Sequence, residues 1–227
     1  MDQPAVAAPG TPLLVAENLR KTYRRGPEQV RALAGASLSL RPGEIVVLLG
    51  RSGSGKTTLL NVICGWERPD EGTLRFAPEL GADGRVVPWS ALAIVPQDLG
   101  LFDHLTIGDN VELPLRLAGT LGKQTRHRAG ALLRPLGLEG LGGRLPAECS
   151  LGERQRASVA RAMILQPLLL IADEPTGHQD EGSATEVLRA LRWMAGKGTS
   201  CLLATHSEET LPFADRVLRI RDGAVTA

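Results

Sequence analysis

The chain has 227 residues, of which 26 are Lys or Arg and 25 are Asp or Glu, so its formal net charge is +1. A balance this even excludes a whole-surface attraction to nucleic acid or to an anionic membrane. A chain of this length can bury one sizeable core, or a core with a subdomain, without disulfides. Cys64, Cys149 and Cys201 are odd in number and far apart, so we expect buried thiols in a reducing compartment rather than a disulfide framework or a zinc site.

The N-terminal segment, residues 1–12, lacks the basic flank and apolar run of a signal peptide, and we expect it to be flexible. The densest apolar runs of the chain, Ile45–Leu49 and residues 168–172, are far shorter than the roughly 20 residues that span a bilayer. The sequence therefore predicts a soluble globular chain.

In chain order, residues 13–23 and the alternation around 34–40 predict antiparallel strands of a small β-layer, and Pro42-Gly43 turns the chain after them. The run Ile45–Leu49 then predicts a strand buried on both faces of a parallel sheet. Further strands of that sheet are predicted over 91–95, 168–171, 200–204 and 216–220. Helices that end at Gly or Pro are predicted over 56–64, 152–166 and 184–195. The alternation indicates an α/β core.

The pattern changes between residues 106 and 149, where Leu-rich helical pieces are interrupted by Pro and Gly, and we interpret it as a helical insertion in the core. The interrupting residues are Pro114, Gly119, Gly122, Pro135 and Gly137. The insertion also carries basic residues, which we expect to form a solvated helix face rather than a binding patch. These residues are Lys123, Arg126, His127, Arg128 and Arg134.

Residues 50–57, Gly-Arg-Ser-Gly-Ser-Gly-Lys-Thr, match the G-x-x-x-x-G-K-[ST] pattern between a predicted buried strand and a predicted helix, which is the context that this pattern requires. In such a loop, main-chain N–H groups surround phosphate oxygens at a helix N-terminus. Lys56 reaches the terminal phosphates and the Thr57 hydroxyl ligates magnesium. The phosphate-binding residues predicted here are Gly50, Ser52, Gly53, Ser54, Gly55, Lys56, Thr57 and Thr58. The predicted ligand is a nucleoside triphosphate with magnesium.

A second element of a nucleotide site follows the predicted strand 168–171. That strand runs into Asp173 and Glu174, where an Asp can hold magnesium and a Glu can lie near an attacking water molecule. An apolar run with an acidic pair is a weak signal by itself. Beside a phosphate loop of the same sheet, the functional interpretation outweighs that of a strand running into an acidic loop.

Together with residues 149–156, Cys-Ser-Leu-Gly-Glu-Arg-Gln-Arg, these motifs resemble the ATP-binding subunit of an ATP-binding-cassette (ABC) transporter. The resemblance covers residues 13–224, and the motifs occur in the family's order. It implies a P-loop NTPase core with a mainly parallel sheet, an N-terminal antiparallel β-layer and an inserted helical subdomain. The core with its β-layer would comprise residues 13–97 and about 160–227, and the helical subdomain about 98–160.

The resemblance also implies roles for single residues. Tyr23 would stack on adenine. Gln97 would approach magnesium and link the core to the insertion, and His206 would contact the terminal phosphate. Asp180 would lie at a dimer interface, although a helix N-cap would suit it as well. The implied catalytic residues are Glu174, His206, Gln97 and Lys56; the implied magnesium ligands are Thr57, Gln97 and Asp173.

The family's signature is represented by Ser150, Gly152 and Glu153, with Leu151 where the family usually has a glycine. Read locally, Ser150 and Glu153 form a capping box that opens a helix. If Ser150 is the N-cap, Leu151 is the first helical residue and takes ordinary helical dihedral angles. In the family this helix start faces the ATP held by the other subunit, which uses the unpaired N–H groups of the first turn.

Residues 172–177 and 109–115 resemble the branch with the macrolide-efflux, lipoprotein-release and cell-division ATPases, although His178-Gln179 departs from its pattern. The resemblance implies an ATPase that pairs with a second copy of itself or a homologous subunit. At the cytoplasmic face of the cell membrane it would drive a separate membrane permease for export or extraction, with no nucleic-acid partner. The permease would choose the substrate. The alternative is a regulatory ATP-binding module with slow turnover that signals to a membrane partner.

Overall fold

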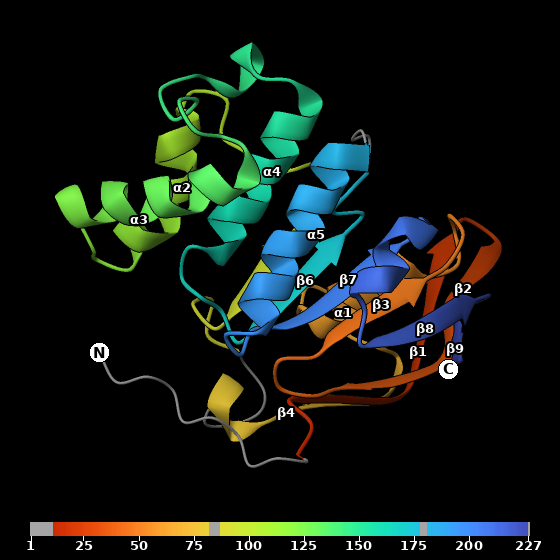
Figure 1. Cartoon of the computed structure of the whole chain (residues 1–227). Coiled ribbons are helices and arrows are strands. Elements are labelled where there is room, and N and C mark those ends of the chain that lie inside the picture. The colour runs from red at the N-terminus through yellow and green to blue at the C-terminus, as the bar shows by residue number, and fades with distance from the viewer. Residues whose placement is uncertain (1–10, 82–86, 178–180, 227) are drawn as a thin grey trace.

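The computed structural model describes residues 11–81, 87–177 and 181–226 (Figure 1). Most of the predicted flexible segment 1–12, and Asp180, lie outside the described residues. The strands are β1 (Leu14–Arg25), β2 (Glu28–Leu40), β3 (Ile45–Leu49), β4 (Glu71–Phe76), β5 (Leu92–Val95), β6 (Leu169–Asp173), β7 (Ser200–Thr205), β8 (Arg216–Arg221) and β9 (Ala224–Thr226). The α-helices are α1 (Lys56–Ile63), α2 (Ile107–Leu117), α3 (Lys123–Leu133), α4 (Leu151–Met163) and α5 (Glu181–Ala195). The 3₁₀ helices are η1 (Pro78–Leu80), η2 (Arg134–Leu136), η3 (Pro146–Glu148) and η4 (Glu208–Phe213).

The larger sheet has the strand order β5-β6-β7-β3-β8-β9. All pairs in it are parallel except β8 with β9, which are antiparallel. The predicted mainly parallel sheet is confirmed. Because parallel strands carry their carboxyl ends to one edge, the loops that follow β5, β6, β7 and β3 lie next to one another.

The central strands of this sheet are buried on both faces. Because successive side chains point to opposite sides, each strand contributes to two cores. In β3, Ile45 and Val47 pack in one core with α4 and α5, whereas Val46 and Leu48 pack in a second core with α1 and the β-layer. β6 and β7 divide their side chains between the same two cores. Figure 1 shows α5 lying across one face of the sheet. The continuous apolar runs in the sequence therefore reflect burial on two sides.

The β-layer is a three-stranded antiparallel sheet with the order β2-β1-β4. Its strands β1 and β2 confirm the predicted antiparallel pair. β4 was not predicted from the sequence, because most of its side chains are exposed and give no apolar run.

The insertion contains α2 and α3, and α2 packs against α4 (Figure 1). Thr106 caps α2 by accepting a hydrogen bond from the Asp109 N–H at 3.1 Å. The prediction that Pro114 interrupts a helix is wrong, because Pro114 lies inside α2. Ile107, Val111 and Leu115 are buried on one face of α2, and this packing outweighs the hydrogen bond that proline removes.

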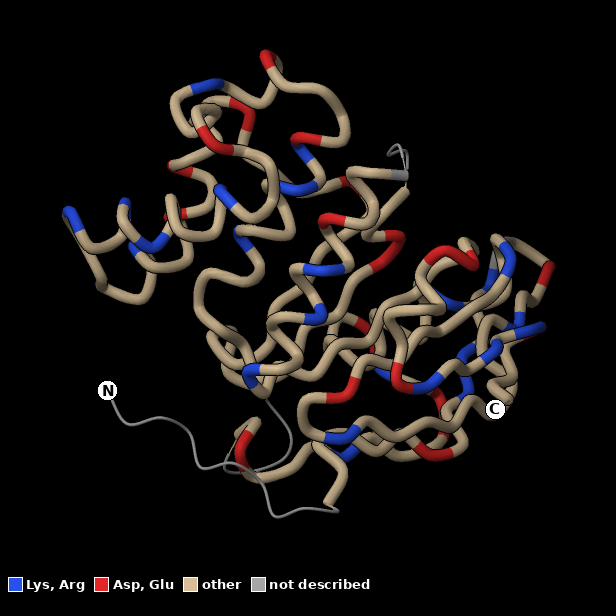
Figure 2. Tube along the Cα trace, viewed as in Figure 1, with Lys and Arg blue, Asp and Glu red and all other residues tan. Residues whose placement is uncertain are grey.

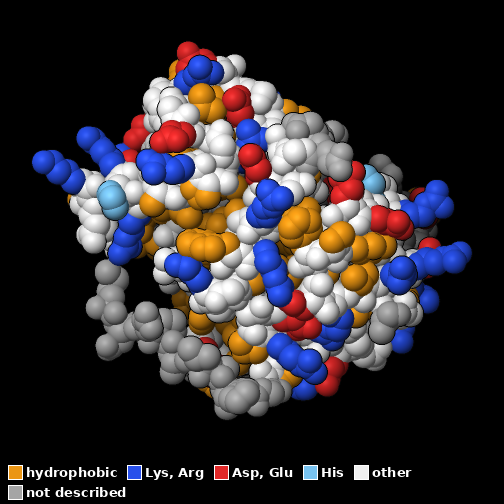
Figure 3. All heavy atoms as spheres, viewed as in Figure 1, with side chains coloured by type: hydrophobic (Ala, Val, Ile, Leu, Met, Phe, Trp, Pro, Cys, Tyr) orange, Lys and Arg blue, Asp and Glu red, His pale blue; other side chains and the backbone are white. Residues whose placement is uncertain are grey.

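The surface matches the even charge balance of the sequence. Figure 2 shows basic and acidic residues interspersed over the two sheets, and the predicted basic helix face around α3 is exposed. On the face seen in Figure 3, hydrophobic side chains gather in patches, with charged side chains of both signs around and between them. Of the predicted buried thiols, Cys149 and Cys201 are buried and Cys64 is partly so. No helix in the described part of the chain is long and apolar enough to span a bilayer.

Gly223 joins the two sheets to the loop that follows β3. Its N–H donates to the Ser54 carbonyl at 3.0 Å, and its carbonyl accepts from the Ala34 N–H at 2.8 Å. Gly223 has φ 76°, and a Cβ there would lie 2.7 Å from the Ala32 carbonyl oxygen. Only glycine fits this joint without moving the main chain.

We therefore expect Gly223→Ala to lower the free energy of unfolding by about 2 to 5 kcal/mol, since it adds overpacking to left-handed strain. Gly26→Ala is the matched control, because Gly26 has φ 62° and open space around its Cβ position. It should cost only the conformational strain of about 1 to 2 kcal/mol. Urea unfolding measures both. Equal losses in the two variants would contradict the close approach at Gly223.

Candidate active site

The loop between β3 and α1 carries residues 50–55, and two of its glycines are required by its shape. Gly53 has φ 78° and Gly55 has φ 105°, which side chains disfavour. A Cβ at Gly55 would also lie 2.4 Å from the Ala32 carbonyl oxygen. The loop leads directly into α1, and the first N–H groups of a helix have no partner within it. This arrangement suits an anion.

Lys56 is buried at the start of α1. Its Nζ donates to the Gly50 carbonyl at 2.7 Å and to the Arg51 carbonyl at 3.3 Å, and it lies 3.6 Å from Glu174 Oε1. The Ser54 hydroxyl is buried and has no hydrogen-bond partner within the described residues. A buried hydroxyl of this kind needs a partner. The loop thus offers a cation and a helix N-terminus, which together fit the oxygens of a phosphate group, whereas Ser54 lines a neighbouring hollow.

Asp173 ends β6 and faces the same loop. The Thr57 hydroxyl donates to Asp173 Oδ2 at 2.7 Å. Burial raises the pKa of the Asp173 carboxyl above its usual range, and this effect outweighs the lowering by the Thr57 hydrogen bond. A hydroxyl and a carboxylate side by side are oxygen ligands of the kind that magnesium takes, so this pair fits the predicted metal.

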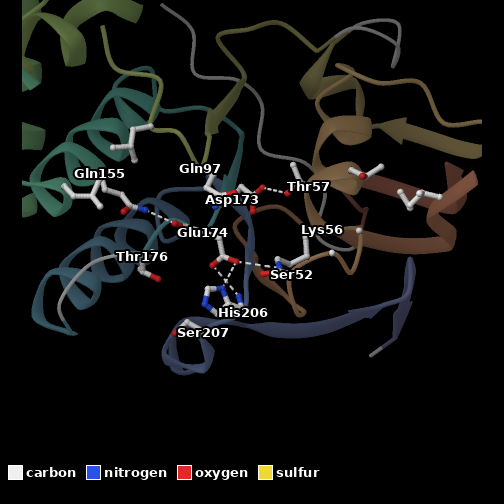
Figure 4. Close-up of a pocket in the computed structure, with 18 of the residues that line it drawn as sticks. Ser52, Lys56, Thr57, Gln97, Gln155, Asp173, Glu174, Thr176, His206 and Ser207 are labelled. Carbon is white, nitrogen blue, oxygen red and sulfur yellow. Dashed lines mark hydrogen bonds and ion pairs between the residues drawn. The ribbon is translucent and has the colours of Figure 1, made fainter. Parts of the chain in front are cut away.

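Glu174 follows at once and holds its carboxylate in the cavity (Figure 4). Oε2 accepts from the Thr205 hydroxyl at 2.8 Å, and Oε1 lies 2.9 Å from His206 Nδ1. The main chain of Glu174 is left-handed, with φ 50°, which costs about 1 to 2 kcal/mol for a residue with a Cβ. Backbone strain of this kind gathers at functional sites.

These groups line one cavity of about 670 Å³, a volume within the range of small-molecule sites. The cavity brings together most of the predicted site residues. They are Ser52, Gly53, Gly55, Lys56, Thr57, Thr58, Gln97, Asp173, Glu174 and His206. Gln97 follows β5, Asp173 ends β6 with Glu174 directly after it, and His206 follows β7, so the edge of the parallel sheet assembles the site.

Other predicted site residues lie elsewhere. Gly50 and Ser54 line a neighbouring hollow on the other side of the loop. Tyr23 does not line the main cavity, and its hydroxyl instead donates to Glu67. Asp180 is outside the described residues.

The predicted capping box is present. The Ser150 N–H donates to the Glu153 carboxylate at 2.7 Å, and the Glu153 N–H donates to Ser150 Oγ at 3.3 Å. Leu151 is the first residue of α4, as predicted, and its side chain lines the main cavity. Ser150, Gly152 and Glu153 do not line that cavity.

Sequence reasoning gave no role to Gln155 or Thr205. Thr205 is fully buried beside His206 and binds the Glu174 carboxylate. Gln155 lines the cavity from α4, and its side-chain amide donates to the Glu174 carbonyl at 2.7 Å. The only signal for Gln155 was its place in the segment 149–156, and the only signal for Thr205 was its place next to His206.

The sequence profile of the family described as "ABC transporter" matches residues 33–177. The macrolide export ATP-binding/permease protein MacB of Shigella flexneri is 39% identical over 223 residues, which are 95% of this chain and 34% of that protein. MacB of Chlorobium luteolum is 37% identical over 228 residues, which are 97% of this chain and 34% of that protein. The chain thus spans about a third of the length of the curated relatives that it matches.

Solved structures of ABC transporter cassettes are also similar to this chain. The dimeric structure of MJ0796, described as a bacterial ABC transporter cassette, has 31% identity and a TM-score of 0.83, covering 94% of this chain and 97% of that one. The dimeric post-hydrolysis state of the same cassette, bound to ADP and Pi, has 29% identity, a TM-score of 0.84 and the same coverage. The resemblance read from the motifs is confirmed: this chain belongs to the ABC transporter family and is an ATPase cassette of it.

Proposed function

We propose that the chain is the motor of a transporter, which closes as a dimer on ATP, hydrolyses it with magnesium, and drives a conformational change in a membrane permease. The relatives named above combine an ATP-binding part with a permease and are named for macrolide export. This supports export or extraction of a substrate as the work done, at the cytoplasmic face of the membrane. The identity of the substrate follows from the permease.

The observation that carries the proposal is the Glu174 carboxylate, held in the phosphate-loop cavity between Lys56, Thr205 and His206. A carboxylate so placed can accept a proton from a water molecule that attacks the terminal phosphate. Lys56 balances negative charge that develops on the phosphate oxygens. His206 Nδ1 lies 2.9 Å from Glu174 Oε1, and we propose that His206 orients the carboxylate and contacts the terminal phosphate.

Magnesium, when bound, neutralises charge on the phosphate oxygens, and Thr57, Asp173 and Gln97 are the residues proposed to hold it. Asp173 and Thr57 already form a pair, and Gln97 lines the same cavity. Tyr23 remains our proposed adenine contact, although it would have to approach the ligand from outside the main cavity.

The start of α4 is proposed to close the site of the facing copy, with Ser150 and Gly152 near the terminal phosphate. The dimeric structures of the similar cassette support pairing. Because Ser150 caps the helix and Leu151 is helical, the N–H groups of the first turn stay directed along the helix axis. Asp180 is proposed to contribute to the same interface.

One observation favours the alternative of a regulatory module with slow turnover. The Leu151 side chain is 39% exposed and lines the cavity, where the family usually has a glycine. A bulky side chain there could keep a partner's phosphate at a distance. In that case the chain would bind ATP and change shape but turn over slowly.

Glu174→Gln should lower magnesium-dependent ATP hydrolysis by at least about 100-fold and leave ATP binding intact, because the amide cannot accept the proton. Glu28→Gln, an exposed change on β2, is the control and should behave as wild type. Phosphate release measured over a range of protein concentrations gives the rate, which should rise faster than linearly if the dimer is the active form. Wild-type turnover in Glu174→Gln would refute the proposed role.

Asp173→Asn should raise the melting temperature of the ligand-free protein. Since burial raises the pKa of Asp173, the native state binds its proton more tightly than the unfolded state, and the charged form destabilises the fold above the raised pKa. The gain should be present at pH 7 and vanish as the pH falls towards about 4. For a domain of this size, a change of about 1 kcal/mol in the free energy of unfolding shifts the melting temperature by about 2 to 4 °C.

The same variant should lose most of the stabilisation that wild type gains from ATP with magnesium, since a proposed metal ligand is gone. Thermal unfolding with and without ligand measures both effects. Asp103→Asn, at an exposed position, is the control. A lower melting temperature of ligand-free Asp173→Asn at pH 7 would show that the charged carboxylate stabilises the fold.

Leu151→Gly should change the turnover number by less than about threefold, because the first-turn N–H groups that bind an anion do not depend on this side chain. Leu151→Ala removes the side chain without adding glycine's backbone freedom and should agree. Steady-state hydrolysis at saturating ATP decides between the two functions. A rise of about tenfold or more in both variants would favour the regulatory module.

A further inference from the structure

Helix α4 contacts two loops of the site through polar side chains spaced three residues apart. Gln155 Nε2 donates to the Glu174 carbonyl at 2.7 Å, and Ser158 Oγ donates to the Leu99 carbonyl at 2.7 Å. Arg161 Nη2 donates to the Leu99 carbonyl at 3.0 Å. A spacing of three keeps these side chains along one side of a helix. One rigid element therefore holds both the end of β6 and the segment that follows Gln97.

The residues held in this way have unusual main-chain conformations. Glu174 has φ 50°, and Leu99 has φ 65°. Residues with a Cβ stay in this left-handed region only when their surroundings hold them there. Gln155 is 4% exposed and Ser158 is fully buried, so both donors are committed to these carbonyls rather than to solvent.

We propose that Gln155 is a positioning residue for hydrolysis: by binding the Glu174 carbonyl, it keeps that residue left-handed and its carboxylate aimed at Thr205 and His206. Figure 4 shows the Gln155 amide reaching the main chain of Glu174 from α4, while the Glu174 carboxylate points into the cavity. Because Ser158 and Arg161 fix Leu99 from the same helix, α4 also sets the distance between the Glu174 carboxylate and the Gln97 segment. This inference rests on the proposed function of Glu174 in hydrolysis.

A positioning role can be separated from a role in folding, because the end of β6 has other anchors. The Glu174 carbonyl also accepts from the Gly177 N–H at 3.0 Å, and the Glu174 N–H donates to the Ala204 carbonyl at 2.8 Å. Loss of the Gln155 hydrogen bond therefore leaves the carbonyl paired and the strand end attached. What changes is the freedom of the Glu174 main chain, and with it the direction of the carboxylate.

Gln155→Met keeps the length of the side chain and removes the donor, and Gln124→Met, at an exposed position of α3, is the matched control. In the full chain, Gln155→Met should lower the turnover number by about tenfold or more while KM for ATP stays within about twofold, because misdirection affects the chemical step and not substrate binding. The control should match wild type. A wild-type turnover number in Gln155→Met would overturn the proposal.

A double-mutant cycle with Glu174→Gln shows whether Gln155 acts through Glu174. Once the carboxylate is gone, Gln155→Met should cause no further loss, so the double variant should retain the residual rate of Glu174→Gln. A further loss of about tenfold in the double variant would mean that Gln155 acts independently of Glu174, which contradicts the proposal.

Amide hydrogen exchange tests the same contact without any turnover. In ligand-free Gln155→Met, the amides of Glu174 and Gly177 should exchange about tenfold faster or more than in wild type, while those of β3 stay unchanged. Unchanged exchange at both amides would overturn the proposal even in a protein that hydrolyses ATP. If the wild-type protein does not hydrolyse ATP but both amides still exchange faster in Gln155→Met, the positioning contact stands and the proposed motor function is refuted.

Discussion

The site depends on the burial of three neighbouring parallel strands, β6, β7 and β3, on both faces of one sheet. Their alternating side chains pack into two separate cores, so none of these strands can shift or turn over without exposing apolar surface on both sides. The ladder continues past the strand ends, where the Gly50 N–H donates to the Thr205 carbonyl at 3.0 Å and the Glu174 N–H to the Ala204 carbonyl at 2.8 Å. The positions of the phosphate loop, the acidic pair and His206 are therefore fixed by the sheet and not by the loops themselves.

Hydrogen bonds from neighbouring elements offset the backbone strain at Glu174. Glu174 is left-handed, and its carbonyl is held by Gln155 while its carboxylate is held by Thr205. Each hydrogen bond contributes about 0.5 to 1.5 kcal/mol, or more to a charged group, which is enough to offset about 1 to 2 kcal/mol of backbone strain. The carboxylate is thus held in one orientation, and a preorganised group lowers the cost of organising a site during a reaction.

Sequence patterns predicted the central sheet well because burial on two faces leaves apolar runs that turn residues interrupt. The same logic placed most of the site, since each motif follows such a run. It failed where tertiary contacts decide: Pro114 lies inside α2 because a buried face holds the helix, and β4 has too few buried side chains to be seen. It also gave no role to Gln155, because a main-chain acceptor 19 residues away leaves no pattern in the sequence.

The charged and polar groups of the site are paired with one another and with the main chain. Lys56 donates a hydrogen bond to the Gly50 carbonyl in the loop before α1, and Asp173 accepts a hydrogen bond from the Thr57 hydroxyl. The Thr57 hydrogen bond does not offset the desolvation of Asp173, so burial raises the pKa of its carboxyl. A divalent cation at this place would remove that penalty. The burial that disfavours the charged carboxylate therefore favours a cation beside it, which supports the proposed role of Asp173 as a magnesium ligand.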